Sequence, residues 1–181
     1  MILHESLVEQ TINRDERGRF HKELIVVRAG GGEEGTPLAM IRKRSAEVST
    51  PLAPVVLIHG YGQNRYAWHL PSRSLFNYLA ASGFDVYNLE LRGHGRSRHL
   101  GAHPPRRVST FVEEDLPAAL AEVERLSGAP AFLVGHSLGG LIAYATAAHL
   151  PELVRGVATL GSPYQFTRGS LSLSVLGSLA L

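Results

Sequence analysis

The 181-residue sequence contains no cysteine. This absence excludes a disulfide framework, a thiolate metal site and a cysteine nucleophile. No apolar run approaches the roughly 18 residues that a transmembrane helix needs. The first ten residues, MILHESLVEQ, also lack the basic start and apolar stretch of a signal peptide. We therefore expect a cytoplasmic protein without a transmembrane segment.

An excess of charge of one sign is missing as well. The chain has 18 Lys and Arg against 16 Asp and Glu, a formal net charge of +2, and the basic residues are scattered. Nucleic-acid binders carry a concentrated basic surface, so we expect no nucleic-acid partner. With 44% hydrophobic and 19% charged residues, the composition is that of an ordinary globular protein. We predict a single domain over residues 1–181; the sequence does not indicate an oligomeric state.

The strand signals change character along the chain. HKELIVVR (21–28) and LAMIRKR (38–44) flank a Gly-rich loop and predict an antiparallel hairpin. Four later runs are short, rich in β-branched residues and mostly apolar throughout, as in strands that are covered on both faces. These runs are residues 54–60, 84–91, 130–135 and 154–161.

Helical segments separate the apolar runs. The first is expected to begin near Pro71. The second begins either at Thr110, which has a capping-box partner in Glu113, or at Asp115. The third covers 138–150 and is rich in Gly and Ala, which allow close packing on a sheet. Alternating strands and helices predict the α/β class: a mostly parallel, doubly wound sheet opened by an antiparallel hairpin, with its chemistry at the carboxyl ends of the strands.

The GHSLG stretch at 135–139 fits the pattern GxSxG where a predicted strand leads directly into a helix. Gly135 and Gly139 suit a sharp, crowded turn that raises the hydroxyl of Ser137 above the sheet. The helix N-terminus would also favour the negative charge that develops during acyl transfer. The plainer alternative is that Ser137 only caps the helix. The strand and helix around the motif favour a nucleophile elbow.

The HGYG stretch at 59–62 follows another predicted strand, VVLI, and so faces the same edge of the sheet. Gly60 and Gly62 permit a tight turn there. A tetrahedral intermediate needs at least two preorganised hydrogen-bond donors around its oxyanion. We expect the backbone N–H groups of Tyr61 and Leu138 to supply them.

LIHGYG, LELRGHGRS and LVGHSLGG stand in the order and spacing of α/β-hydrolase fold serine hydrolases. The chain resembles the esterase, lipase and lysophospholipase members of that superfamily. The resemblance implies that Ser137 is the nucleophile and that the N–H groups of Tyr61 and Leu138 form the oxyanion hole. It makes His59 a structural histidine of the oxyanion loop, and it places His136 beside the nucleophile without the role of base. It implies no metal and no organic cofactor.

The resemblance covers roughly residues 20–165 and has one departure. Glu90 stands where the family usually has Asp before the LRGHG turn. We expect this change to affect loop packing more than chemistry.

A serine nucleophile needs a histidine base and a carboxylate, which the family supplies in the order Ser, acid, His. The sequence after Ser137 contains one acid, Glu152, and one histidine, His149, in the reverse order. His149 would also lie about 18 Å from Ser137 along the helix. His94, at the carboxyl end of a strand, is the remaining candidate base.

Two further histidines, His99 and His103, lie in an Arg-rich loop that is either solvated or attracts anionic substrates. The resemblance implies two more strands and a final helix, with the acid and base after those strands. We therefore expect an N-terminal part of an α/β-hydrolase that lacks the last strands, with its acid and base beyond Leu181. Residues 162–181 are then the expected start of a lid segment.

The leading hypothesis is a serine hydrolase that cleaves carboxylic esters through an acyl-enzyme on Ser137. Its substrate would be a small-molecule ester, with lipid esters among the candidates. One alternative is a truncated or degenerate hydrolase that binds a ligand or partner without turnover. The other is a dinucleotide-binding protein in which GYGQNR forms the loop and Glu90 binds the ribose, although Arg65 stands where a third glycine belongs. The sequence does not define the acyl chain or the leaving group.

Overall fold

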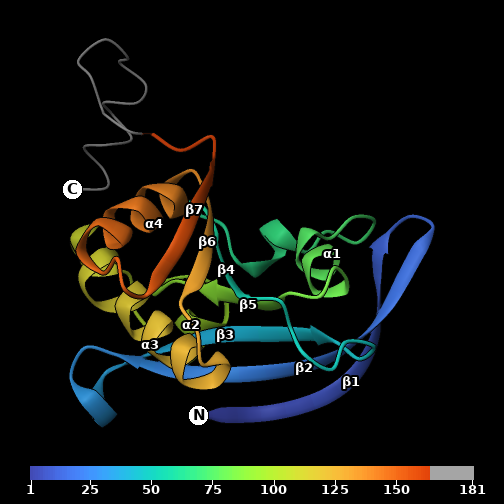
Figure 1. Cartoon of the computed structure of the whole chain (residues 1–181). Coiled ribbons are helices and arrows are strands. Elements are labelled where there is room, and N and C mark those ends of the chain that lie inside the picture. The colour runs from blue at the N-terminus through green and yellow to red at the C-terminus, as the bar shows by residue number, and fades with distance from the viewer. Residues whose placement is uncertain (164–181) are drawn as a thin grey trace.

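The computed structural model describes residues 1–163. They form one seven-stranded sheet with the order β1-β2-β3-β5-β4-β6-β7 (Figure 1). The pairs from β1 through β3 to β5 are antiparallel, and β5, β4, β6 and β7 are mutually parallel. The strands are β1 Ile2–Asn13, β2 Glu16–Ala29, β3 Thr36–Ser45, β4 Pro54–Ile58, β5 Asp85–Glu90, β6 Ala131–His136 and β7 Val154–Leu160. The predicted hairpin and all four predicted parallel strands are confirmed.

The helices pack on both faces of this sheet. Figure 1 shows α3 and α4 together on one side and α1 on the other, which is the doubly wound arrangement. None of the described helices is long and apolar enough to cross a membrane. The helical elements are η1 Gly32–Glu34, η2 Arg65–Trp68, α1 Leu75–Ala81, α2 Gly95–His99, a π-helical turn η3 Phe111–Asp115, α3 Leu116–Ser127 and α4 Leu138–His149.

The central strand β4 shows why the apolar runs have no polar alternation. All five of its residues are buried. Val55 and Leu57 pack in the cluster that includes α1, whereas Val56 and Ile58 pack in the cluster beneath α3 and α4. Because both faces of the strand are covered, every position favours an apolar side chain.

Several boundaries differ from the sequence prediction. The first helix begins at Leu75 rather than near Pro71, because the Ser74 hydroxyl accepts the Asn77 N–H at 3.0 Å and caps the helix there. The helical backbone of the second helix begins at residues 109–110, passes through the π-helical turn Phe111–Asp115 and continues without a break as α3 from Leu116, with Pro117 in the first turn of α3. The side chain of Thr110 makes no capping hydrogen bond, but Thr110 and Asp115 both have helical backbone angles, so the earlier of the two predicted starts is the closer one.

Within residues 1–163 the sheet ends at β7, where Val157 and Leu160 are 39% and 45% exposed. The two further strands implied by the family resemblance lie outside the described residues. The same is true of residues 164–181, which make up most of the predicted lid segment.

Candidate active site

Ser137 lies in a strained turn between β6 and α4. Its backbone angles are φ 50° and ψ −118°, and it is the only non-glycine residue with positive φ in the described part of the chain. Such a conformation costs on the order of 1–3 kcal/mol and persists only where the surrounding structure enforces it. The Ser137 side chain makes no capping hydrogen bond with α4. The capping alternative therefore lacks support, and the geometry is that of a nucleophile elbow.

Glycines allow three close backbone approaches around this turn. A Cβ atom on Gly135 would lie 2.5 Å from the carbonyl group of Gly139. A Cβ atom on Gly139 would lie 2.3 Å from the carbonyl oxygen of Ile58 and 2.6 Å from that of His59. The N-terminus of α4 thus rests directly on the end of β4, where the HGYG segment begins.

Gly60 brings the HGYG segment against the serine itself. A Cβ atom on Gly60 would lie only 3.2 Å from the Cβ of Ser137. Gly62 has a φ of 68° with open space around it, so its backbone conformation rather than crowding favours glycine there. The two segments that the sequence suggested as partners are therefore adjacent in space.

His59 is fully buried and fixes one peptide plane of the HGYG segment, the predicted oxyanion loop. The Leu91 N–H donates to His59 Nε2 at 3.2 Å, so this nitrogen carries no proton. His59 Nδ1–H consequently donates to the Gly60 carbonyl oxygen at 2.8 Å. In a trans peptide the N–H of Tyr61 points away from that oxygen. The neutral imidazole therefore sets the direction in which the Tyr61 N–H points.

Two backbone donors remain unused at this point. Neither the Tyr61 N–H nor the Leu138 N–H donates a hydrogen bond to an acceptor within residues 1–163. Tyr61 follows Gly60, where an added Cβ would meet Ser137, and Leu138 is the first residue of α4. Two N–H groups without an acceptor in residues 1–163, one beside Gly60 and one directly after Ser137, are the kind of donors that an oxyanion hole requires.

Burial makes His59 sensitive to acid. Loss of solvation lowers its pKa from 6.5 to about 4. Because the folded-state pKa is the lower one, the unfolded chain binds more protons between these values, and stability falls as the pH drops through that window. From pH 7 to 4.5 we expect His59 to remove about 2.5 kcal/mol from the free energy of unfolding.

The measurement is urea unfolding at both pH values for wild type, His59→Gln and the exposed control His103→Gln. The loss between pH 7 and 4.5 should be smaller by that amount in His59→Gln and unchanged in the control. His69, whose pKa burial also lowers to about 4, contributes equally to all three proteins. An equal pH dependence in wild type and His59→Gln would contradict the assignment.

His94 lies beside the oxyanion loop. Its ring centroid is 5.0 Å from that of His59 and 6.4 Å from that of Tyr61. Its Nδ1–H donates to the Arg92 carbonyl oxygen at 2.9 Å. Among residues 1–163, no histidine forms a hydrogen bond with the Ser137 hydroxyl. The structure therefore does not pair His94, or any other described histidine, with the Ser137 hydroxyl.

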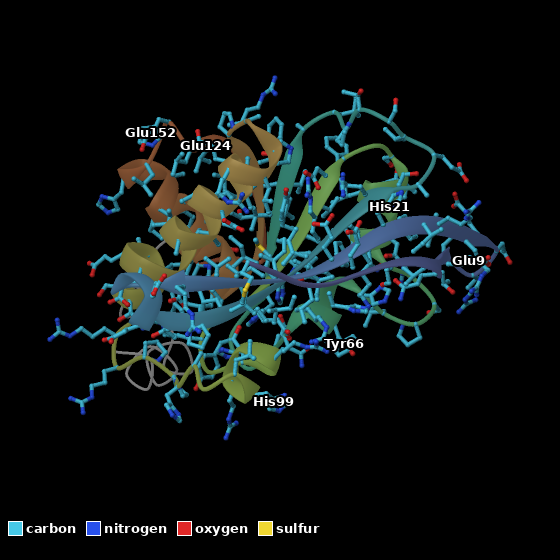
Figure 2. The ribbon with its side chains drawn as sticks, turned by 90° about the horizontal axis from the view of Figure 1, so that it is seen from below. Glu9, His21, Tyr66, His99, Glu124 and Glu152 are labelled. Atoms are coloured by element: carbon cyan, nitrogen blue, oxygen red, sulfur yellow. The ribbon has the colours of Figure 1, made fainter. Side chains whose placement is uncertain are left out.

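The remaining polar candidates lie elsewhere. His149 is exposed at the far end of α4. In the view of Figure 2, Glu152 lies at the opposite side of the molecule from His99 and Tyr66. His99, His103 and the nearby Arg98, Arg106 and Arg107 are exposed, and none of these side chains forms an ion pair within the described residues. A solvated loop explains them without a role in the reaction.

Glu90 has a packing role. It is fully buried, and it accepts hydrogen bonds from Arg65 Nη1 at 2.8 Å and from the Arg96 N–H at 3.1 Å. A Cβ on Gly95 would overlap its carboxylate at 1.8 Å. The expected effect on loop packing fits this arrangement. A carboxylate enclosed in this way is not available to a ribose, which argues against the dinucleotide alternative.

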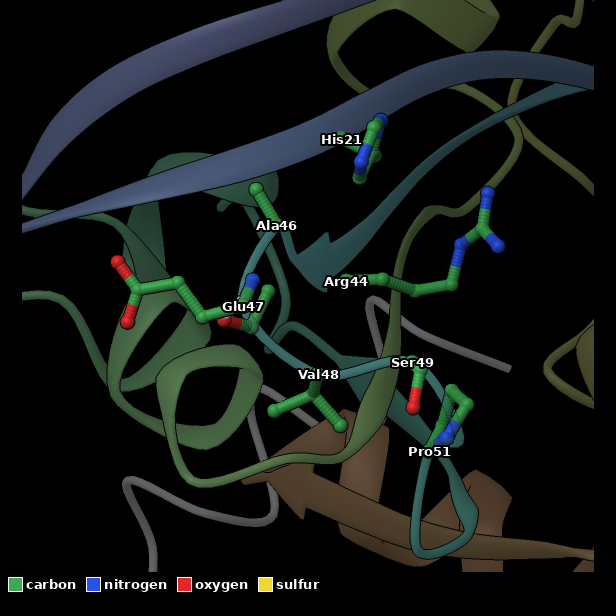
Figure 3. Close-up of a pocket in the computed structure, with 8 residues that line it drawn as sticks. His21, Arg44, Ala46, Glu47, Val48, Ser49 and Pro51 are labelled. Atoms are coloured by element: carbon green, nitrogen blue, oxygen red, sulfur yellow. Dashed lines mark hydrogen bonds between the residues drawn. The ribbon is translucent and has the colours of Figure 1, made fainter.

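A surface depression of about 320 Å³ lies away from this site (Figure 3). It follows the end of β3 and precedes the start of β4, so it lies at the opposite edge of the parallel strands from Ser137. The residues that line it are His21, Arg44, Ser45, Ala46, Glu47, Val48, Ser49 and Pro51. Residues 1–163 contain no group of three or more His, Cys, Asp or Glu side chains that could hold a metal ion.

The fold and the elbow define the class of protein. The family model described as the alpha/beta hydrolase fold matches residues 53–176, and the chain belongs to this family. The predicted superfamily and its fold are confirmed. The relatives are hydrolases, and they include both esterases and epoxide hydrolases.

Two curated bacterial relatives illustrate the range of substrates that the names of these relatives give. The chain is 32% identical over 117 residues to (E)-2-((N-methylformamido)methylene)succinate hydrolase of Acinetobacter baylyi, a match that covers 65% of this chain and 40% of the relative. It is 33% identical over 113 residues to the pimeloyl-[acyl-carrier protein] methyl ester esterase of Yersinia pseudotuberculosis, covering 62% and 38% respectively. This chain thus matches about two fifths of the length of these relatives.

Solved structures agree on the fold. A carboxyl esterase from Bacillus coagulans, with glycerol bound, superposes with a TM-score of 0.64 at 21% identity over 87% of this chain and 50% of that chain. A monoacylglycerol lipase from Paleococcus ferrophilus superposes with a TM-score of 0.56 at 25% identity over 78% of this chain and 49% of that chain.

Proposed function

We propose that this protein is a serine hydrolase that cleaves carboxylic esters through an acyl-enzyme on Ser137. The observation that carries the proposal is the strained Ser137 turn together with two backbone donors that have no acceptor within residues 1–163, the N–H groups of Tyr61 and Leu138. A structure tolerates such strain where the turn has a function, and the unpaired donors give that function a chemical form.

In the proposed reaction, Ser137 Oγ attacks the ester carbonyl carbon while a base takes its proton. The carbonyl oxygen becomes an oxyanion, which the N–H groups of Tyr61 and Leu138 stabilise. Collapse of the intermediate breaks the C–O bond of the ester, the leaving oxygen takes the proton back from the base and departs as the alcohol, and the acyl group stays on Ser137. Water, activated by the same base, then releases the carboxylic acid and restores the serine.

The base and acid are proposed to come from sequence beyond Leu181. The coverage of the relatives supports this, because the chain matches only 40% and 38% of two of them. The relatives include a methyl ester esterase and also an epoxide hydrolase, so the choice of an ester rests on the acyl-transfer geometry proposed for Ser137, and the methyl ester esterase supports it. We propose a small-molecule ester as the substrate.

The test is labelling with a fluorescent alkyl fluorophosphonate, which reacts with activated serines. Protein expressed from the natural start codon to the natural stop codon should take up one phosphonate per chain. Peptide mass mapping should place it on Ser137, and an excess of 4-nitrophenyl butyrate should slow the labelling. No labelling of the folded protein would favour the non-catalytic binding alternative, and labelling of another residue would overturn the assignment of the nucleophile.

A further inference from the structure

Gln63, in the turn that follows the oxyanion loop, holds both polar backbone groups of Gly60. Its own N–H donates to the Gly60 carbonyl oxygen at 3.2 Å. Its side-chain Oε1 accepts the Gly60 N–H at 2.9 Å. Together with the bond from His59 Nδ1–H, these contacts leave Gly60 no freedom to rotate. The peptide that presents the Tyr61 N–H is thus fixed from both sides.

The same amide oxygen also reaches the nucleophile elbow. Gln63 Oε1 lies 3.0 Å from His136 Nδ1, and His136 directly precedes Ser137. Because the Gly60 N–H can only donate, the atom that faces it must be the oxygen of the Gln63 amide, which fixes the orientation of that amide. An oxygen can only accept, so His136 Nδ1 carries a proton. His136 is therefore held in the Nδ1–H form, with Nε2 as its free nitrogen when the ring is neutral.

The side chain of Gln63 connects the two segments just beyond the point where the backbone hydrogen bonds of the sheet end. The ladder between β4 and β6 ends at the pair Ile58 and Gly135. No backbone hydrogen bond within the described residues joins 59–62 to 136–140, the two segments that carry the oxyanion donors. The side chain of Gln63 bridges that gap, and it does so where a Cβ on Gly60 would meet Gln63, His136 and Ser137 together.

We propose that Gln63 is a positioning residue of this active site. Its amide oxygen ties the segment of Tyr61 to the elbow of Leu138 and so sets the separation of the two oxyanion donors. It also selects the tautomer of His136. This inference rests on the proposed function, since the spacing of the donors matters for catalysis only if Ser137 forms an acyl-enzyme.

The first test compares wild type with Gln63→Met, which keeps the length of the side chain and removes the acceptor. We expect kcat for a 4-nitrophenyl ester, and the rate of phosphonate labelling of Ser137, to fall by about 10- to 100-fold, with KM changed less than about threefold. Tyr66→Phe is the matched control, because it removes a hydrogen bond with Arg65 from the same segment without touching Gly60 or His136. Its rates should equal those of wild type.

The second test reads the tautomer directly. The imidazole ¹⁵N chemical shifts of His136, assigned by their loss in His136→Asn, should show the Nδ1–H form in wild type. In Gln63→Met they should move toward the Nε2–H form. An Nε2–H tautomer in wild type would overturn the bond on which the inference depends, whether or not Gln63→Met folds.

The proposed function and the positioning role of Gln63 can be tested independently. If wild type is not labelled by the phosphonate, the proposed function fails, while the tautomer measurement still tests the contact of Gln63. If wild type is labelled and folded Gln63→Met is labelled at the same rate, the proposed function stands and the positioning role of Gln63 is wrong.

Discussion

Replacing Ser137 with alanine is expected to lower kcat/KM for ester hydrolysis by about 10⁴- to 10⁶-fold. The substitution removes the attacking oxygen but leaves the N–H groups of Tyr61 and Leu138 in place. Residual acceleration over water should therefore remain, on the order of 10³-fold, because oxyanion stabilisation and binding act without the nucleophile. Steady-state assays with 4-nitrophenyl butyrate measure both quantities. Hydrolysis within tenfold of wild type would show that Ser137 is not the nucleophile.

Ser137→Gly is the matched variant, because it also lacks the hydroxyl but tolerates the backbone conformation. Glycine adopts positive φ readily, whereas alanine retains the strain of φ 50°. We expect Ser137→Gly to be more stable than Ser137→Ala by about 1 kcal/mol, even after the larger entropy of the unfolded glycine chain is counted. Both should be equally inactive. Equal stability in urea unfolding would show that the turn stores no strain.

The sequence alone predicted the parallel strands and the turn at GHSLG, because each has a recognisable local residue pattern. β4 is apolar at five consecutive positions since it is buried on two faces. The glycines at 135 and 139 mark close backbone contacts that no other residue type permits. A strand followed at once by GHSLG therefore predicted the turn in which Ser137 lies.

The first strand left no such signal. β1 pairs with β2 along its length, yet all but one of its residues are at least partly exposed. Backbone hydrogen bonds hold it, and these do not depend on apolar side chains at regular intervals. Burial alternates from Ser6 through Val8 to Gln10, but two of these three inward positions are polar, so no apolar alternation marked the segment as a strand.

The polar contacts around the site could not be predicted from the sequence either. The side chain of Gln63 meets His136 across 73 positions of the chain, and Arg92 is held by Asp115 through a bond of 2.6 Å. Such contacts depend on which side chains face each other once the crossovers have formed. Glutamine in a loop is usually solvated, and nothing in the motif around Gln63 distinguishes it from that case.

Replacing Gly139 with alanine is expected to damage both stability and activity, although helix propensity alone predicts a gain of about 1 kcal/mol. The added Cβ would lie 2.3 Å from the carbonyl oxygen of Ile58, a backbone atom that cannot rotate away. Such overpacking should outweigh propensity and lower the free energy of unfolding by about 2 kcal/mol.

The same clash pushes the N-terminus of α4, with Leu138 and its N–H, away from the end of β4. A displacement of about 1 Å at a catalytic donor lowers the rate by about 10²-fold, and we expect kcat for a 4-nitrophenyl ester to fall by at least that factor. Gly156→Ala in β7 is the control, because its nearest neighbours are ring atoms of Phe132 at 3.1 Å, which can shift. It should change stability by less than about 1 kcal/mol and leave kcat unchanged. If Gly139→Ala instead gained stability and kept its activity, the close contact between α4 and β4 would not be what holds the two oxyanion donors together.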